Sequence, residues 1–239
     1  GNLYVSPSGH RLYYTCRAGI LEFSLSTNWD FSSATQTSTN TSNGADAAKS
    51  PQYNEFTQGV FFKPDGTKMY ELGYPSQVYQ GIFEFDLDAW NLSTYSDTGK
   101  SSLNLIIEKD GETSEVVYDI FIDDSGTKLY AGYRYWIVEY EFGTAWDIST
   151  LSYVRKLPND CPNIPDDALG MWGCSGIQFA PDGKSLYAMG NTGSLYTGQQ
   201  GYFFTLDIAW DLSTASKPYY FTIDNLPDAY YSGIQIGGN

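Results

Sequence analysis

The side chains of this chain that could carry acid–base chemistry are mostly carboxylates, and histidine is rare. The chain holds 28 acidic residues but a single histidine, His10, which falls in a Pro-Ser-Gly-His turn. A Ser-His-Asp relay needs an imidazole base beside its nucleophile, and the turn with His10 belongs to a repeated segment, described below, that looks like scaffold. A two-carboxylate glycosidase stays open as an alternative, because so many acidic residues always allow a pair.

Metal-binding patterns are also weak. The segment Asp123-Asp124-Ser125-Gly126 offers the oxygen atoms that calcium prefers, but three or more further ligands are not in view. No CxxC or Cys/His spacing suggests zinc. Of the three cysteines, Cys161 and Cys174 flank a Pro-containing loop, so a disulfide and two unpaired thiols both stay open, and Cys16 has no evident partner. We therefore predict no catalytic residue, no metal and no cofactor.

Aromatic and polar side chains of a few variable segments suit ligand binding better. The candidate binding residues are Tyr74, Arg134, Tyr135, Trp136 and Trp172. Aromatic rings stack on the apolar faces of sugars, while amides and carboxylates satisfy hydroxyl groups. A glycan is thus the leading partner, and a surface protein is the close alternative, because Tyr, Trp and Arg are favoured at interfaces. Burial against a neighbouring loop is the other interpretation of each residue.

Two motifs, each present four times, provide the elements that must position these residues. The first has the form apolar–x–Pro–Asp–Gly–Thr–Lys–apolar–Tyr, and the second has the form Trp–Asp/Asn–apolar–Ser–Thr/Ser. Copies of the first motif span residues 61–70, 121–130 and 179–187, with a weaker copy at 4–13. The second motif begins at Trp29, Trp90, Trp146 and Trp210, at spacings of 61, 56 and 64 residues. A period of this size indicates a repeat architecture.

One repeat is readable as four strands. Residues 59–62 form a short apolar run typical of a strand covered on both faces, and the Pro-Asp-Gly turn leads to a second strand at 68–72. Residues 82–87 alternate as a half-buried third strand, and a more polar fourth segment follows the Trp motif. With no helix-period segment, this pattern predicts an all-β protein, a β-propeller of four blades with four antiparallel strands each.

The repeats predict a single domain over residues 1–239. Its copies cover about 1–55, 56–115, 116–173 and 174–231, and residues 232–236 resemble the first strand of a further copy. That last strand either closes a four-bladed ring or shows that the chain is a fragment of a larger propeller. We favour closure, because an unpaired propeller edge promotes aggregation.

The repeated residues themselves have a structural interpretation. Each Trp of the second motif is expected to pack between blades, and the following Asp and Ser/Thr to tie the turn through side-chain-to-backbone hydrogen bonds. These turns and the Pro-Asp-Gly turns share one uniform face of a propeller. The loops of the opposite face differ between copies, so recognition is expected there.

Charge excludes some partners. The net charge of −15 argues against nucleic acid and anionic membrane surfaces, which require clustered Lys and Arg. No apolar run approaches the roughly 18 residues that span a bilayer, so membrane insertion is not expected. The acidic surface fits an extracellular, cell-surface or virion setting, and a homo-oligomer or a larger assembly stays open.

The paired motifs Phe-x-x-Asp-Gly-Thr-Lys-x-Tyr and Trp-Asp-Ile-Ser-Thr resemble a repeat of propeller-like proteins from bacteriophages and environmental bacteria. The clearest copies lie at 56–70, 116–130 and 174–187, while Ser8, His10 and Arg11 depart from the pattern. The resemblance implies attachment or structural roles on virions or cell surfaces. Propeller lactonases and phosphatases resemble the chain in plan, but their metal-binding residues cannot be assembled here. The sequence predicts a non-catalytic binding module for glycans or cell surfaces, with an assembly component and a lactonase- or glycosidase-type propeller hydrolase as alternatives.

Overall fold

The described part of the chain is almost entirely β-structure. The computed structural model describes residues 3–16, 19–40, 59–73, 81–103, 117–133, 136–157, 171–192, 199–216 and 218–223. The chain divides into two compact units, one of Gly1–Ser114 with Trp146–Thr150 and the other of Glu115–Ala145 with Leu151–Asn239. Within the described residues no helix is long and apolar enough to cross a bilayer.

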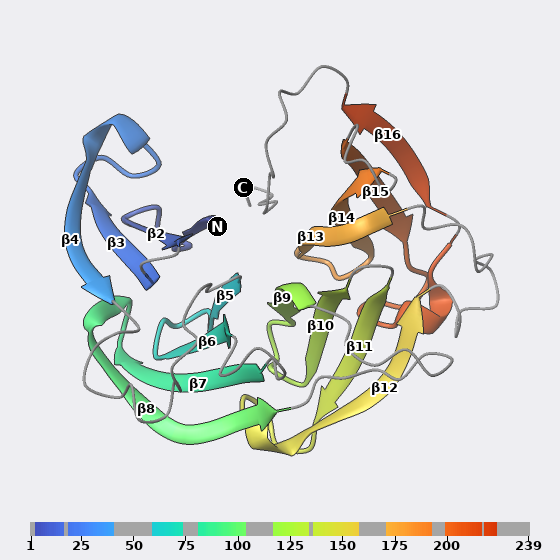
Figure 1. Ribbon diagram of the computed structural model, residues 1–239, viewed down its shortest axis with the longest axis horizontal. Coiled ribbons are helices and arrows are strands. Elements are labelled where there is room, and N and C mark those ends of the chain that lie inside the picture. Colours follow the sequence, from blue (N-terminus) through green and yellow to red (C-terminus); the bar gives the residue numbers. More distant parts are fainter. Residues whose placement is uncertain are drawn as a thin grey trace. The chain divides into compact units, whose positions relative to one another are not determined.

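The strands form four antiparallel sheets, each with four strands hydrogen-bonded in chain order (Figure 1). Sheet 1 consists of β1 (Leu3–Val5), β2 (Arg11–Cys16), β3 (Gly19–Leu25) and β4 (Ala34–Asn40). Sheet 2 consists of β5 (Gly59–Phe62), β6 (Lys68–Gly73), β7 (Gly81–Asp88) and β8 (Asn91–Leu103). Sheet 3 consists of β9 (Val117–Ile122), β10 (Lys128–Tyr133), β11 (Ile137–Phe142) and β12 (Leu151–Leu157). Sheet 4 consists of β13 (Met171–Phe179), β14 (Ser185–Thr192), β15 (Gln199–Thr205) and β16 (Tyr219–Ile223).

Each sheet matches one sequence repeat, and a four-stranded meander of this kind is a propeller blade. The predicted fold class, an all-β propeller with four blades of four strands, is confirmed. The proposed closing strand at 232–236 lies outside the described residues. Three short 3-10 helices, η1 (Phe31–Ser33), η2 (Ile148–Thr150) and η3 (Leu212–Thr214), follow the Trp of the second motif in repeats 1, 3 and 4.

Within a sheet, a glycine in the turn of the first motif contacts the tryptophan that begins the turn of the second motif. All four Trp residues of the second motif adopt a left-handed backbone, with φ between 63° and 65°, which is unusual for a bulky side chain. In sheet 2, the Trp90 N–H donates to the carbonyl oxygen of Gly66 at 3.0 Å, and the Trp90 ring lies directly over this glycine. Sheets 1 and 4 repeat the arrangement with the pairs Gly9–Trp29 and Gly183–Trp210.

Side chains close the turn after each Trp, as the sequence predicted. The Ser32 N–H donates to Asp30 Oδ1 at 2.9 Å, and Ser213 N–H donates to Asp211 Oδ1 at 2.9 Å. Asn91 and Asp147 accept the equivalent bonds in the other two copies. A short polar side chain that bonds to the backbone two residues on stabilises a tight turn.

A second contact holds this turn against the preceding repeat. In sheet 2, Tyr70 donates its hydroxyl hydrogen to the carbonyl oxygen of Trp146 at 2.7 Å, and Glu84 Oε2 accepts the Ile148 N–H at 3.0 Å. Lys68 Nζ lies 2.6 Å from the other oxygen of Glu84. We call such a Tyr, Glu and basic residue, acting on the next Trp turn, a clasp.

Three clasps are present among the described residues. Tyr13, Glu22 and Arg11 hold the turn at Trp90, with Glu22 accepting the Leu92 N–H at 2.7 Å. Tyr130, Glu139 and Lys128 hold the turn at Trp210, with Glu139 accepting the Leu212 N–H at 3.2 Å. The three glutamates are at most 1% exposed. Each buried carboxylate is therefore compensated by a cation and a backbone donor, as a buried charge must be.

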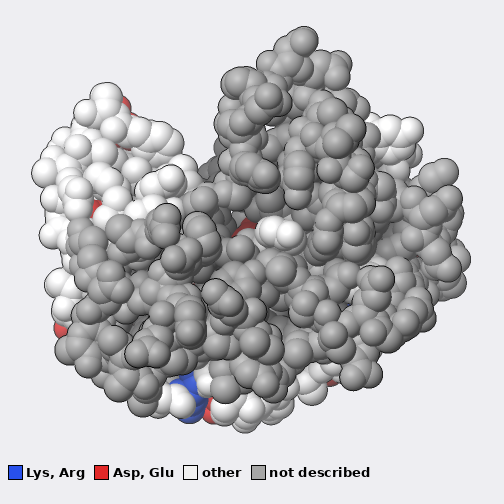
Figure 2. Space-filling view, viewed as in Figure 1, with Lys and Arg blue, Asp and Glu red and all other residues white. Residues whose placement is uncertain are grey.

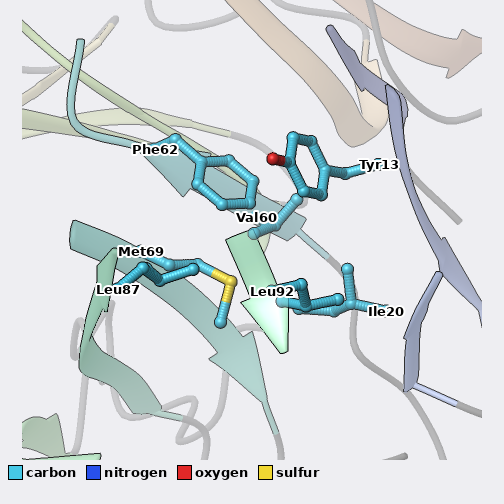
Figure 3. Packing of buried hydrophobic residues seen from close by; sticks show 7 residues of the cluster. All are labelled: Tyr13, Ile20, Val60, Phe62, Met69, Leu87 and Leu92. Carbon is cyan, nitrogen blue, oxygen red and sulfur yellow. The ribbon is translucent and has the colours of Figure 1, made fainter. Parts of the chain in front are cut away.

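Apolar packing between neighbouring sheets complements the clasps. Figure 3 shows side chains from sheets 1 and 2 meeting in one cluster, composed of Tyr13, Ile20, Val60, Phe62, Met69, Leu87 and Leu92. The Trp90 ring stacks on Tyr4 of sheet 1 with ring centres 6.1 Å apart. In the other unit, Trp210 stacks on Phe121 of sheet 3 at 6.0 Å. These two tryptophans pack between sheets as predicted, whereas Trp29 is 46% exposed.

The clasps predict a loss of stability at alkaline pH. Burial raises the pKa of Tyr130 well above the ordinary value of 10.0, and Glu139 raises it further. The folded protein therefore keeps the Tyr130 proton above pH 10 while the unfolded chain loses it, so stability present below pH 10 falls as pH rises. Each such tyrosine should lower the free energy of unfolding by about 1.4 kcal/mol for every pH unit above pH 10.

Urea titrations between pH 8 and 11 would measure this slope. Tyr130→Phe should be less stable at pH 8, because it lacks the bond to Trp210, but should show a shallower decline above pH 10. Identical slopes in the two proteins would contradict a role for the buried hydroxyl.

Candidate functional site

The structure reaches only part of the binding site predicted from the sequence. Tyr74, Arg134 and Tyr135 lie outside the described residues, and Trp172 is placed in β13 without a described side chain. Trp136 is 1% exposed, and Lys156 Nζ lies 4.7 Å from the centre of its ring. Trp136 thus shows the burial that the sequence left open as the alternative. A ligand face formed by these five residues stays a prediction.

Two other residues singled out by the sequence belong to turns. His10 is exposed in the turn between β1 and β2, where its carbonyl oxygen accepts the Leu25 N–H at 2.8 Å. Asp123 is 4% exposed and accepts the N–H groups of Thr127 and Lys128 at 2.8 and 2.7 Å. Its carboxylate oxygens stabilise the turn before β10. No group of three or more His, Cys, Asp or Glu among the described residues is placed to hold a metal ion.

One carboxylate stands out on the strands that open the four sheets. Among the described residues of β1, β5, β9 and β13, Asp119 is the only Asp or Glu. It is 3% exposed in the otherwise apolar strand β9, and its Oδ2 accepts the Ile177 N–H of β13 at 2.9 Å. This bond fixes the orientation of the carboxylate between the first strands of sheets 3 and 4.

The backbone around Asp119 is irregular. Asp119 pairs with Gly132, and the register of β9 and β10 shifts directly after this pair. Strand β13 has two further shifts, on either side of Cys174. Added at Gly132, a Cβ atom would lie 2.7 Å from the Cys174 carbonyl oxygen, so the sheets approach closely here. β-bulges are over-represented beside active sites, where they re-aim side chains, which makes Asp119 the leading candidate for chemistry in the described region.

The neighbouring thiol is not a nucleophile in this environment. Cys174 is fully buried, and burial raises the pKa of its thiol, with the Asp119 carboxylate raising it further. A thiol with a raised pKa stays protonated at neutral pH, and the thiolate is the reactive form. Within the described residues Cys174 is a free cysteine, and the disulfide with Cys161 that the sequence left open stays a prediction. Cys161 itself lies outside the described residues.

The remaining buried carboxylates are committed to structure. Glu22, Glu84 and Glu139 each bind a backbone N–H and a basic side chain in the clasps. A glycosidase pair built from them would require breaking these contacts.

Figure 2 shows one small basic patch beside an acidic side chain on the face drawn, while most of the described surface there is uncharged.

The comparisons with known proteins show the fold. No protein family and no curated sequence matches the chain. Among solved structures, a candidate 6-phosphogluconolactonase from Bacteroides uniformis matches with a TM-score of 0.52 and 15% identity, over 90% of this chain and 55% of its own. A functionally unknown protein from Desulfotomaculum acetoxidans matches with a TM-score of 0.50 and 11% identity, over 95% of this chain and 71% of its own. A second candidate 6-phosphogluconolactonase, from Bacteroides fragilis, matches with a TM-score of 0.45 and 14% identity, over 93% of this chain and 57% of its own.

One of these matches corrects a prediction. The sequence led us to predict that the protein is not an enzyme, and this prediction is contradicted by the likeness to one structure described as a candidate 6-phosphogluconolactonase. That prediction relied on the missing histidine base, and it overlooked a carboxylate inside an apolar strand. The chain spans little more than half the length of the two candidate 6-phosphogluconolactonases, and at this identity the likeness shows the fold alone.

Proposed function

We propose that the chain is a β-propeller hydrolase of the lactonase type. The alternative predicted from the sequence, a propeller hydrolase, is thereby preferred to a non-catalytic binding module. The fold shared with a candidate 6-phosphogluconolactonase supports the class of reaction. The observation that carries the proposal is Asp119, a buried carboxylate held in place by the Ile177 N–H among three register shifts.

Lactone hydrolysis has simple requirements. Water attacks the carbonyl carbon, the ring C–O bond breaks, and the products are a carboxylic acid and a hydroxyl group. A positioned base that removes the water proton accelerates such a step by about 10²–10⁴-fold. We assign this role to Asp119, whose carboxylate is held rigidly by a backbone donor, and a phosphorylated sugar lactone is the first substrate to test.

The test compares the purified chain with two variants on 6-phosphogluconolactone and on lactones without phosphate. Asp119→Asn keeps an oxygen that can accept the Ile177 N–H but removes the basic carboxylate, so turnover should fall at least 100-fold toward the spontaneous rate. Asp30→Asn is the matched control, because Asn caps a helix as well as Asp, and it should keep full activity. Absence of turnover above the spontaneous rate in the unmodified protein, or full activity of Asp119→Asn, would refute the proposal.

A further inference from the structure

Sheet 3 reverses a residue pairing that sheets 2 and 4 share. At the position of Asp119, counted back from the turn glycine of the first motif, both of these sheets have a glycine on their first strand. Each glycine pairs with a large apolar residue of the second strand, in the pairs Gly59–Leu72 and Gly176–Met189. In sheet 3 the first strand carries Asp119, and the second strand carries the glycine, Gly132. The equivalent residue of sheet 1, Asn2, lies outside the described residues.

The glycine on the second strand makes room for another part of the chain. Residues directly opposite each other on antiparallel strands point to the same face, with Cβ atoms about 4.5–5.5 Å apart. The space beside the Asp119 side chain is therefore left open by Gly132, and Cys174 of β13 occupies it. A Cβ atom at Gly132 would lie 2.7 Å from the Cys174 carbonyl oxygen and 2.9 Å from its Sγ. Gly132 does not have a left-handed backbone, so the approach of Cys174, and not φ, requires a glycine here.

These contacts form a closed ring around the carboxylate. Asp119 pairs with Gly132, and Gly132 contacts Cys174. Three residues after Cys174, the Ile177 N–H returns to Asp119 Oδ2 at 2.9 Å. The register of β13 shifts on both sides of Cys174, so this part of the strand departs from a regular ladder where it meets Gly132. All four residues belong to the same compact unit.

We infer that Gly132 and Cys174 are positioning residues for Asp119. Their close contact holds β13 where the Ile177 N–H fixes the carboxylate in one orientation. The catalytic consequence rests on the proposed function, in which Asp119 is the base. Orientation matters for such a group, because a displacement of about 1 Å can lower a rate about 100-fold.

Hydrogen exchange of the Ile177 amide, followed by NMR, tests the ring without any substrate. Alanine at Gly132 must push the Cys174 main chain away, which separates the Ile177 N–H from its acceptor. The Ile177 amide should then exchange at least about 10-fold faster, as expected when a hydrogen bond to a charged group is lost. The amides of β11 serve as the reference, because they report the stability of the same unit.

Gly183→Ala is the matched control for this exchange experiment. Gly183 lies in the same unit, and a Cβ atom there would lie 2.3 Å from the Trp210 ring, at φ +67°. The substitution therefore introduces a collision away from Asp119. Any acceleration at Ile177 should match that of the β11 amides in Gly183→Ala and should exceed it in Gly132→Ala.

Steady-state kinetics on the lactone that the unmodified protein hydrolyses test the catalytic consequence. Gly132→Ala should lower kcat about 10- to 100-fold while KM stays within about 3-fold, because the base is misplaced and substrate binding is not. Gly183→Ala should keep its kcat. If Gly132→Ala does not fold, Cys174→Ala takes its place: it removes the Sγ atom that faces Gly132 without adding an atom, and it should show the same pattern on a smaller scale.

The two measurements separate this inference from the proposed function. Exchange at Ile177 that follows the β11 amides in both Gly132→Ala and Cys174→Ala would overturn the ring of contacts. Faster exchange at Ile177 with an unchanged kcat would overturn the positioning role. Faster exchange in a protein that hydrolyses no lactone would support the ring of contacts and refute only the proposed function.

Discussion

Replacing Glu84 with alanine is expected to lower the free energy of unfolding by about 3–5 kcal/mol. The Glu84 side chain is 0% exposed, with one oxygen 2.6 Å from Lys68 Nζ and the other accepting the Ile148 N–H at 3.0 Å. Its removal leaves a buried backbone donor without an acceptor and takes one anion from Lys68. A buried donor without a partner costs the full desolvation penalty of that group, so the loss should exceed that of a surface ion pair.

Urea denaturation followed by tryptophan fluorescence measures the loss, and two variants separate its causes. Glu84→Gln keeps an oxygen for the Ile148 N–H and should lose less than Glu84→Ala. Asp86→Asn removes the second partner of Lys68, at 2.7 Å, but the Asp86 side chain is 57% exposed, so it should cost less than about 1 kcal/mol. If Glu84→Ala were as mild as Asp86→Asn, the clasp would contribute nothing beyond surface electrostatics.

Replacing Gly66 with alanine is expected to lower the free energy of unfolding by about 2–5 kcal/mol. Gly66 has φ +73°, and a Cβ atom there would lie 2.5 Å from three atoms of the Trp90 ring. The left-handed backbone costs an L-residue about 1–2 kcal/mol, and forcing an extra carbon into a packed site costs about 1–3 kcal/mol. The ring cannot move away freely, because the Trp90 N–H is bonded to the Gly66 carbonyl oxygen at 3.0 Å.

Gly73→Ala provides the control for this prediction. Gly73 lies in β6 of the same sheet, its φ is not positive, and an added Cβ would meet the Phe83 ring at 3.7 Å, an ordinary contact. Its stability should stay within about 1 kcal/mol of the unmodified protein. Thermal denaturation of both variants decides the matter, and equal losses at the two positions would exclude the Trp90 collision as the cause.

Repeated residues made the fold predictable from the sequence. The apolar run at 59–62 was expected to be covered on both faces, and all four residues are buried. The bonds from Asp30 and Asp211 to the serines two residues on follow from the turn chemistry of short polar side chains. Each of these features depends on neighbours in the sequence, so one repeat predicts the next.

Contacts between repeats could not be predicted in the same way. Residues 82–87 read as a strand with one buried and one exposed face, yet Glu84 is fully buried while Phe83 and Phe85 are only partly buried. The carboxylate is inside because a turn more than sixty residues later supplies its hydrogen bond. The burial of Asp119 could not be predicted for the same reason, since its hydrogen-bond donor Ile177 belongs to the following repeat.

The contact between each turn glycine and its tryptophan ties two distant positions together. Once the Trp90 ring is gone, alanine at Gly66 meets only the backbone penalty, so the costs of the two changes are not additive. A tryptophan held at φ 65° is itself strained and persists only where its surroundings support it. Either residue therefore constrains the other during sequence drift. The first repeat fits this coupling: it has exchanged the neighbouring residues for Ser8, His10 and Arg11, yet it retains both Gly9 and Trp29.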